Sequence, residues 1–487
     1  MQVNKAKPTI RVRHEESCRE GEFELIEVKQ KIPSFMRRKQ GLSGESDPMS
    51  YRVDMEMVAN YFNLDDCMIH KACGRQCMVM DGVVKPGEEF TVTGTRRLDR
   101  IASDSMDCSE TEIPKSRTAI LYDKRMKLHD GKGPESPARM SGIWSSCIED
   151  NRFDKICTVI EARKATREEL EWTHSPGHVD AVMASRLEMF NHTTDVFVGE
   201  GSGEAACLAS GGLTDLALKV CEGEFENGFA VIRPPGHHCY YDQASGFCLV
   251  NNVLVAANVL LQKQKAKRIL IVDWDVHHGN GTQAILEQQF KQRFDRCEAT
   301  KATPEILFVS LHQTRNDFYP KTGTLDQLAY EGAKRFIINI PFDEVYGDNE
   351  IINAFEQIVM PISQMYDPDF VFVSAGFDAV KGDKLGGQLC SQQVFGHLTS
   401  MLMSLAKGKI VCALEGGYQI LETAYCVREC ISALIGKKPK GLSVYVEKPY
   451  LQEDQLKKHT DMMHRVKQFY GDYWTCLSHP QYLASEK

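Results

Sequence analysis

The sequence predicts an α/β protein in which a mainly parallel β-sheet lies between two layers of helices. Two observations support this fold class. Short apolar runs recur without polar alternation, and helical segments separate successive runs. Strands that are apolar on both faces are typical of a covered sheet, and strand–helix alternation is typical of parallel βαβ units. A chain of 487 residues with 42% hydrophobic residues can also form a large core.

The expected elements follow one another along the second part of the chain. The predicted strands are Thr118–Tyr122, Phe229–Ile232, Arg268–Val272, Ile306–Leu311, Phe336–Ile340, Phe370–Ser374 and Ile410–Leu414. The clearest helical segments are Val253–Gln264, Ile351–Met365 and Val394–Leu405. These elements predict a domain over residues 116–440. In the last segment, 441–487, we expect Glu453–Trp474 to form a helix that packs on this domain.

Residues 1–115 form a separate N-terminal extension of unknown function. Polar, charge-mixed stretches predict that it is partly disordered. A short helix over Asp54–Phe62 and a strand over Glu89–Thr93 are expected within it. The extension also contains a cysteine and histidine cluster, Cys67, His70, Cys73 and Cys77. This cluster is either a zinc knuckle or a set of ordinary buried thiols, because its spacing matches no finger pattern.

Composition narrows the class of protein. The formal net charge of −9 argues against direct nucleic-acid binding through a basic surface. The 17 cysteines include no CxxC pair, which indicates reduced, intracellular thiols. We expect a nuclear or cytoplasmic protein, and the cysteines do not distinguish the two compartments. No apolar run reaches 18 residues, and the N-terminus has no apolar core of a signal peptide. We therefore expect neither membrane insertion nor secretion.

The motif DWDVHHGNG, Asp273–Gly281, follows the apolar run Arg268–Val272. In an extended segment, residues two apart face the same side, so Asp275 and His277 can face one centre. A carboxylate and an imidazole on one side of a strand end can form half of a zinc site. Taken alone, the pattern favours a polar loop whose aspartate caps the next helix. The other strand ends decide between these interpretations.

Three further strands end in unusual polar residues. RPPGHH carries His237 and His238, AGFD carries Asp378, and EGGY carries Tyr418. The carboxyl ends of parallel strands meet at one edge of a sheet, which is where ligands of open α/β sheets bind. Four such endings in one domain are difficult to explain as ordinary turns.

The residue types also suit one reaction. Asp275, His277 and Asp378 would supply three ligands and leave a position open, which is the pattern of a catalytic zinc site. The tandem histidines can act as general base and acid. Tyr418 can donate a hydrogen bond to a developing oxyanion. The sequence therefore predicts the hydrolysis of an amide.

Taken together, these motifs resemble those of the zinc-dependent histone deacetylases, with the closest similarity to class II members. The matching motifs are RPPGHH, GFC at Gly246–Cys248, DWDVHHGNGTQ, SLH at Ser310–His312, SAGFDA and LEGGY, within residues 118–436. The resemblance implies the arginase/deacetylase fold, with about eight mainly parallel strands. It also implies hydrolysis of N6-acetyl-lysine to lysine and acetate, a role in chromatin and transcription repression, and partners such as histone tails and corepressor proteins.

The resemblance assigns roles to the strand-end residues. Asp275, His277 and Asp378 match the zinc ligands. Among the catalytic residues, Asp273 matches the partner of His237, and Asn280 matches the partner of His238. A carboxylate favours an imidazolium and an amide does not, so we expect His238 to be the principal base and acid and His237 an electrostatic helper.

The same comparison predicts one zinc ion and full activity. Vertebrate class IIa members carry histidine where this chain has Tyr418, and they act weakly on acetyl-lysine, so tyrosine implies a competent enzyme. Gly142–Trp144 and Arg163–Thr166 resemble class IIa. However, the cluster that holds a second, structural zinc in that group is not matched around His129–Pro134.

Substrate contacts are also implied by the resemblance. Phe247 and Tyr319 match the aromatic walls of an acyl-lysine tunnel, although Phe318 can exchange roles with Tyr319 and core packing is the alternative. Gly246 matches a carbonyl that accepts the substrate N–H, and Asp195 falls near a rim position that grips the substrate backbone. A structural monovalent cation, K+, would be held by Asp273, Asp275, His277, Ser310 and Leu311.

Other functions stay open at this point. Polyamine deacetylases of this family carry a glutamate where this chain has Leu385, so acetyl-lysine in a protein is favoured over small acetylated amines. Non-histone cytoplasmic proteins are alternative substrates. A recruitment scaffold without catalysis is a further alternative, although no ligand and no tyrosine of the site is lost.

Overall fold

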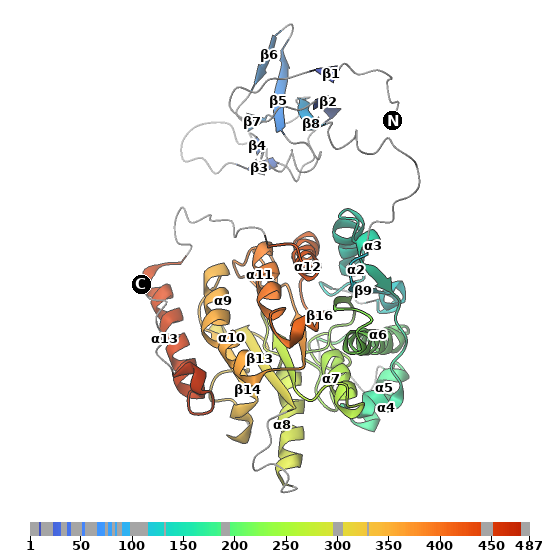
Figure 1. The fold of residues 1–487 in the computed structure, drawn as a ribbon, viewed down its shortest axis with the longest axis vertical. Helices are drawn as coiled ribbons and strands as arrows, with labels where there is room; N and C mark the ends of the chain where they lie inside the picture. Colours follow the sequence, from blue (N-terminus) through green and yellow to red (C-terminus); the bar gives the residue numbers. More distant parts are fainter. Residues whose placement is uncertain are drawn as a thin grey trace. The chain divides into compact units, whose positions relative to one another are not determined.

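The computed structural model describes residues 115–439 and 451–478 except for 131–132, 187–194, 296–304 and 329–330, together with strands nearer the N-terminus. The chain divides into two compact units, Met1–Thr111 and Glu112–Lys487 (Figure 1).

The first unit contains two sheets whose strands all pair antiparallel. The larger has the order β1 (Thr9–Ile10), β2 (Phe23–Gln30), β8 (Phe90–Arg97), β5 (Asp66–Cys73) and β6 (Gln76–Val79). The smaller consists of β3 (Arg37–Lys39), β4 (Tyr51–Val53) and β7 (Val83–Val84). The strand expected at Glu89–Thr93 corresponds to β8. The helix expected at Asp54–Phe62 and the side chains of the Cys67–Cys77 cluster lie outside the described residues.

The second unit is built on one eight-stranded sheet in which every pair is parallel. The order is β10 (Thr158–Ile160), β9 (Thr118–Tyr122), β11 (Asn227–Val231), β16 (Ile410–Leu414), β15 (Phe370–Ala375), β12 (Ile269–Asp273), β13 (Ile306–Gln313) and β14 (Ile337–Phe342). Every residue of β11 to β16 is buried, which agrees with the unbroken apolar runs. The predicted parallel α/β sheet is confirmed.

Helices connect these strands and cover the sheet. They include α2 (Ala138–Gly142), α3 (Phe153–Ile156), α4 (Arg167–Glu171), α5 (Pro176–Met183), α6 (Ser202–Glu222), α7 (Asn252–Gln262), α8 (Asn280–Asp295), α9 (Asp348–Ala354), α10 (Met360–Tyr366), α11 (Gln392–Leu402), α12 (Ile420–Leu434) and α13 (Glu453–Tyr470). Helices α6 and α7 pack together, α11 and α12 form a second pair, and both pairs contact central strands. The result is the expected three-layer αβα fold.

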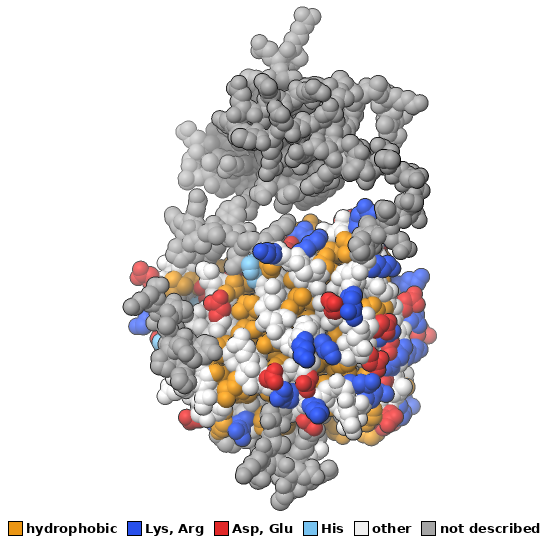
Figure 2. Space-filling model, in the orientation of Figure 1, with side chains coloured by type: hydrophobic (Ala, Val, Ile, Leu, Met, Phe, Trp, Pro, Cys, Tyr) orange, Lys and Arg blue, Asp and Glu red, His pale blue; other side chains and the backbone are white. Residues whose placement is uncertain are grey.

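The C-terminal helix α13 packs on the edge strand β14. The backbone N–H of Asn339 donates to the Tyr470 hydroxyl at 2.9 Å, and Met462, Met463 and Val466 are buried beneath the helix. Within the part of the chain that the structure describes, no helix has the length and apolar character needed to cross a membrane. On the face shown in Figure 2, basic and acidic side chains are interspersed, and its described part carries no continuous basic patch.

Candidate active site

The three predicted metal ligands meet at the carboxyl edge of the sheet. Strand β12 leads into Asp275 and His277, and its neighbour β15 leads into Asp378. His277 Nδ1 lies 3.0 Å from Asp275 Oδ1 and 3.0 Å from Asp378 Oδ2. All three side chains are buried. Such spacing suits donor atoms that share one ion at about 2 Å from each.

Backbone hydrogen bonds fix the direction of both carboxylates. Asp378 Oδ1 accepts the Val276 N–H at 2.8 Å, and Asp275 Oδ2 accepts the Gly416 N–H at 2.9 Å. Asp378 Oδ2 faces His277 without a backbone donor, whereas Asp275 Oδ1 also accepts the His277 N–H at 2.9 Å and keeps its second lone pair for a ligand. A Cβ at Gly416 would lie 2.2 Å from Asp378 Oδ2, so this close approach requires glycine. An aspartate–histidine–aspartate set that has its second oxygens held by backbone donors fits a zinc ion.

The electrostatics of these three groups are strongly coupled. Burial favours the neutral carboxyl and raises the pKa of Asp378 to about 7, and nearby Asp275 adds to this effect. Burial opposes the charged imidazole of His277, but Asp378 and Asp275 together raise its pKa to about 9. Burial also acts to raise the pKa of Asp275, yet His237 and His277 hold it well below its ordinary value. The pocket thus concentrates negative charge that a cation would compensate.

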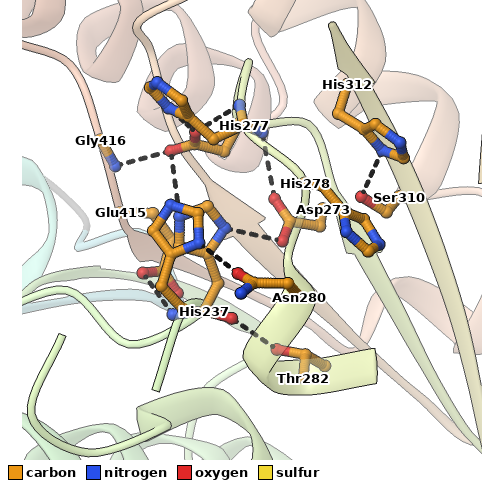
Figure 3. A network of polar contacts seen from close by, with 12 residues as sticks. His237, Asp273, His277, His278, Asn280, Thr282, Ser310, His312, Glu415 and Gly416 are labelled. Carbon is orange, nitrogen blue, oxygen red and sulfur yellow. Dashed lines mark hydrogen bonds and ion pairs between the residues drawn. The ribbon is translucent and has the colours of Figure 1, made fainter. Parts of the chain in front are cut away.

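The other histidine of the motif, His278, points into a different network (Figure 3). Its Nδ1 lies 2.8 Å from the Thr322 hydroxyl and its Nε2 lies 2.9 Å from Gln283 Oε1. Both ring nitrogens are therefore engaged away from the aspartates. The structure selects His277 rather than His278 as the candidate ligand.

The tandem histidines lie beside this centre with different partners. The loop after β11 places the ring centroids of His237 and His238 4.0 Å apart. His237 Nδ1 lies 3.0 Å from Asp273 Oδ2, and His238 Nδ1 lies 2.6 Å from Asn280 Oδ1 (Figure 3). The pairs expected from the sequence are therefore in contact.

These partners separate the two imidazoles electrostatically. Burial disfavours charge on His237, but Asp275 and Asp273 outweigh it and raise the pKa of His237 well above its ordinary value. Burial lowers the pKa of His238 well below its ordinary value, and the positive charges of His237 and His277 add to this effect. At neutral pH one imidazole is cationic and its neighbour is neutral.

Tyr418 lies on the loop after β16, two residues beyond Gly416, whose N–H donates to Asp275. Its ring packs edge-on against Phe247 at a centroid separation of 5.9 Å, and the Arg139 guanidinium lies 5.2 Å from its centroid. Burial raises the pKa of the Tyr418 phenol well above its usual value, and Asp378 and Asp275 act in the same direction. Tyr418 is therefore a neutral hydrogen-bond donor at physiological pH.

Two buried residues that sequence reasoning did not assign support this loop. Glu415 Oε2 accepts the N–H groups of Gly236 and His237 at 2.6 and 3.2 Å, and burial raises the pKa of Glu415 to about 7. Arg139 donates to the Gly417 carbonyl at 2.7 Å and also to the Glu415 carbonyl. Glu415 belongs to the EGGY motif and could have been recognised from the sequence. No motif surrounds Arg139, so nothing in the sequence indicated its role.

Aromatic side chains surround the histidines where the tunnel was expected. Phe318 stacks on His277 at 5.1 Å, and Tyr319 meets the edges of His238 at 5.2 Å and His277 at 5.9 Å. Phe247 contacts Tyr418 from the other side. Both Phe318 and Tyr319 thus lie at the site, and Tyr319 is the one that also touches the base.

The expected rim residues also converge. The Tyr319 hydroxyl donates to Asp195 Oδ2 at 2.6 Å, and the same oxygen accepts the Gly246 N–H at 3.2 Å. A Cβ on Gly246 would lie 2.3 Å from His238 Cδ2, so the loop can approach the histidine only as glycine. Leu385 is 38% exposed, and its N–H donates to Asp383 at 2.8 Å.

The predicted monovalent-cation residues are partly brought together. Asp273 pairs with Ser310 across β12 and β13, and Leu311 follows on β13. The Ser310 hydroxyl lies 2.9 Å from His312 Nδ1 (Figure 3). Cation binding at these residues stays a prediction.

A second cluster of metal-ligating types lies behind the tandem histidines. His174, His178 and Cys239 have ligand atoms within 4.8 Å of one another, and all three are buried. His174 Nε2 accepts the Asn251 N–H at 3.0 Å, and His174 Nδ1 lies 3.0 Å from the Tyr240 carbonyl. Both nitrogens of His174 are thus committed to the backbone, which favours a structural role.

The fold and the site define a parallel α/β protein with a candidate metal centre at the carboxyl edge of its sheet. A sequence profile of the histone deacetylase domain matches residues 133–434. Histone deacetylase 15 of Arabidopsis thaliana is 39% identical over 335 residues, which cover 67% of this chain and 58% of that protein. Histone deacetylase 7 of Homo sapiens is 35% identical over 426 residues, which cover 79% of this chain and 42% of that protein.

A solved structure agrees with these relatives. The crystal structure of the HDA15 HD domain matches with a TM-score of 0.66 and 36% sequence identity. The match covers 76% of this chain and 100% of the solved chain. The chain belongs to the histone deacetylase family and is class II-like. It spans about half the length of the curated relatives that it matches.

Proposed function

We propose that this protein is a zinc-dependent lysine deacetylase that hydrolyses N6-acetyl-lysine in protein tails to lysine and acetate. Histones are the proposed substrates, with chromatin-based repression in the nucleus as the proposed setting and corepressor proteins as partners. The observation that carries the proposal is the position of His237 and His238, paired with Asp273 and Asn280, beside the cluster of Asp275, His277 and Asp378.

The zinc ion would be held by Asp275 Oδ1, His277 Nδ1 and Asp378 Oδ2. When bound, Zn2+ supplies Lewis-acid polarisation of the acetyl carbonyl and lowers the pKa of a water ligand to about 7. The cluster of two carboxylates and one imidazole supports this assignment, because buried like charges need a cation to compensate them.

His238 would act as general base and then as general acid. Its Nδ1–H donates to Asn280 Oδ1, which leaves Nε2 with a free lone pair. His238 Nε2 takes the proton of the attacking water and later gives it to the leaving lysine amine. His237 stays protonated against Asp273 and stabilises negative charge that develops nearby.

Tyr418 would stabilise the tetrahedral oxyanion by donating its phenolic proton in a hydrogen bond. Phe247 and Tyr319 would enclose the lysine stem, and the Gly246 carbonyl and Asp195 would hold the substrate backbone. Leu385 at the mouth offers no charge for a second ammonium. This favours protein acetyl-lysine over an acetylpolyamine.

The test combines metal removal with two substrates. The purified chain should turn over an acetyl-lysine peptide, lose that activity to a chelator and regain it on addition of zinc. Acetylspermidine should be hydrolysed much more slowly under the same conditions. A zinc-loaded chain without turnover on the peptide would contradict the proposal, and faster turnover of acetylspermidine would redirect it to small amines.

A further inference from the structure

One buried carboxylate joins two loops of the site. Asp383 Oδ1 accepts the N–H groups of Leu385 and Gly386 at 2.8 and 3.1 Å. Asp383 Oδ2 accepts those of Tyr418 and Gln419 at 2.7 and 3.0 Å. The residue is only 5% exposed. A single side chain therefore satisfies four backbone donors, two from its own loop and two from the loop that follows β16.

The Asp383 loop is itself fixed to a candidate zinc ligand. It leaves β15 just after Asp378, and a parallel bridge between Val380 and Cys390 closes its base. A Cβ on Gly386 would lie 1.7 Å from the Asp378 carbonyl oxygen, so the returning chain lies directly on that ligand's backbone. Asp383 is thus part of a rigid frame around Asp378.

The Tyr418 loop, by contrast, contains two adjacent glycines and depends on neighbouring groups for its conformation. Gly416 and Gly417 precede the tyrosine, and Gly417 has a φ of +115°, which side-chain-bearing residues rarely adopt. Neighbouring groups hold both glycines, because the Gly416 N–H donates to Asp275 and Arg139 donates to the Gly417 carbonyl. Asp383 accepts the next two N–H groups, those of Tyr418 and Gln419, and so fixes the backbone of the side chain that must meet the substrate.

We propose that Asp383 is a positioning residue that sets Tyr418 against the metal centre, an inference that rests on the proposed function. The carboxylate transfers the rigidity of the Asp378 frame to the Tyr418 backbone. A displacement of about 1 Å of a reacting group can cost about a hundredfold in rate, so this anchor affects the oxyanion step. The four hydrogen bonds of Asp383 all come from backbone N–H groups, so substrate affinity should depend on it little.

The test substitution is Asp383→Asn. An asparagine side chain readily accepts hydrogen bonds from the backbone N–H groups two and three residues further on. Its carbonyl oxygen should therefore keep the hydrogen bonds from Leu385 and Gly386. Its amide NH2 then faces the N–H groups of Tyr418 and Gln419 and cannot accept from them. We expect kcat to fall about tenfold or more, with KM and zinc content within about twofold.

A double-mutant cycle separates positioning from general damage. In a Tyr418→Phe background the hydroxyl to be positioned is gone, so adding Asp383→Asn should change kcat by less than about twofold. An equal fall in both backgrounds would overturn the inference. If Asp383→Asn does not fold, Asp383→Glu keeps both acceptor oxygens but shifts them by one methylene, and it is expected to give the same non-additivity.

Asp369→Asn is the matched control. Asp369 Oδ2 also accepts two backbone N–H groups, from Lys267 and Arg268 at 3.0 and 2.9 Å, but at the opposite edge of the sheet. This variant should leave kcat within about twofold of the wild type.

Amide hydrogen exchange supplies a readout that does not need catalysis. The Tyr418 and Gln419 amides should exchange at least about tenfold faster in Asp383→Asn than in the wild type. In Asp369→Asn their exchange rates should equal those of the wild type. Unchanged exchange at both amides would refute the anchor even if the chain deacetylated nothing. A wild type without turnover but with the expected exchange would refute only the proposed function.

Discussion

Two buried clusters in the unit Glu112–Lys487 contain similar residue types. They differ in whether their ligand atoms are available to bind a metal. Asp275, His277 and Asp378 form one, and His174, His178 and Cys239 form the other. In each, three ligand atoms lie within 4.8 Å of one another. Hydrogen bonding and charge separate the candidate metal centre from the structural cluster.

In the first cluster the backbone leaves ligand atoms available. Val276 and Gly416 donate to the far oxygens of the two aspartates, and the near oxygens face His277. The near oxygen of Asp275 also accepts the His277 N–H at 2.9 Å but keeps a second lone pair. In the second cluster the backbone uses the donor atoms themselves. The charge environment follows: burial lowers the pKa of His174 to about 3, whereas two carboxylates raise that of His277 to about 9. A metal centre therefore needs uncommitted donors and negative charge, not proximity alone.

The largest effect is expected where the first cluster loses a ligand. In Asp378→Asn an amide replaces a carboxylate, so zinc affinity should fall and turnover should drop by about a thousandfold or more. Metal analysis and peptide deacetylation on the same preparation check this. Because the sequence leaves a zinc knuckle at Cys67–Cys77 open, the difference from wild type is the relevant quantity. Retention of both zinc and activity would contradict the ligand assignment.

A smaller effect is expected when the first cluster keeps its metal but loses the donor facing it. Tyr418→Phe removes one hydroxyl and no ligand, so kcat should fall about a hundredfold with zinc content unchanged. Its control is Tyr241→Phe, the same change in the loop after the tandem histidines, which should keep wild-type turnover. Equal kcat in Tyr418→Phe and wild type would exclude the proposed oxyanion role.

The comparison also explains what the sequence could reveal. The motif after β12 is local, so the ligands could be predicted from an apolar run followed by alternating polar residues. Strand β10 was not predicted. It has only three residues, all half-buried at the sheet edge, and therefore lacks a recognisable apolar run. Helix α6 is rich in small residues, and Gly211 lies against the backbone of Ala165, where a Cβ would lie 2.2 Å from nitrogen. Its sequence therefore lacks the bulky apolar stripe that identifies a helix.

Within the site too, the sequence predicted only those residues that belong to a local motif. Asn280 and Asp195 were placed through family resemblance, because no local pattern assigns a partner to His238 or a rim to the tunnel. Asp383 and Arg139 act on backbone groups of loops distant in the sequence. Such contacts depend on how loops meet in three dimensions, and residue type alone carries no signal for them.

The second cluster should respond to acid rather than to chelators. The folded-state pKa of His174 is about 3, below the ordinary 6.5, so the unfolded chain binds an extra proton between these values. Stability is therefore retained above pH 6.5 and lost progressively as the pH falls towards 3. His174→Gln should cost about 1–3 kcal/mol at pH 7.5. It should also flatten the pH dependence by up to about 1.4 kcal/mol per unit. Denaturant unfolding across this window measures both, and an unchanged slope would show that His174 does not titrate this way.

The smallest effect is expected at Cys239, which directly tests whether the second cluster holds metal. Cys239 Sγ lies 3.6 Å from His178 Nε2 and 3.3 Å from the Leu249 carbonyl, and burial raises the pKa of its thiol well above the ordinary value. A thiol that resists deprotonation is a poor zinc ligand, because the thiolate is the form that binds. Cys239→Ala should therefore leave zinc content unchanged and turnover within about twofold, measured beside Asp378→Asn. Loss of one zinc per chain from Cys239→Ala would show that the second cluster also binds metal. Proximity of three ligand atoms would then be sufficient for metal binding.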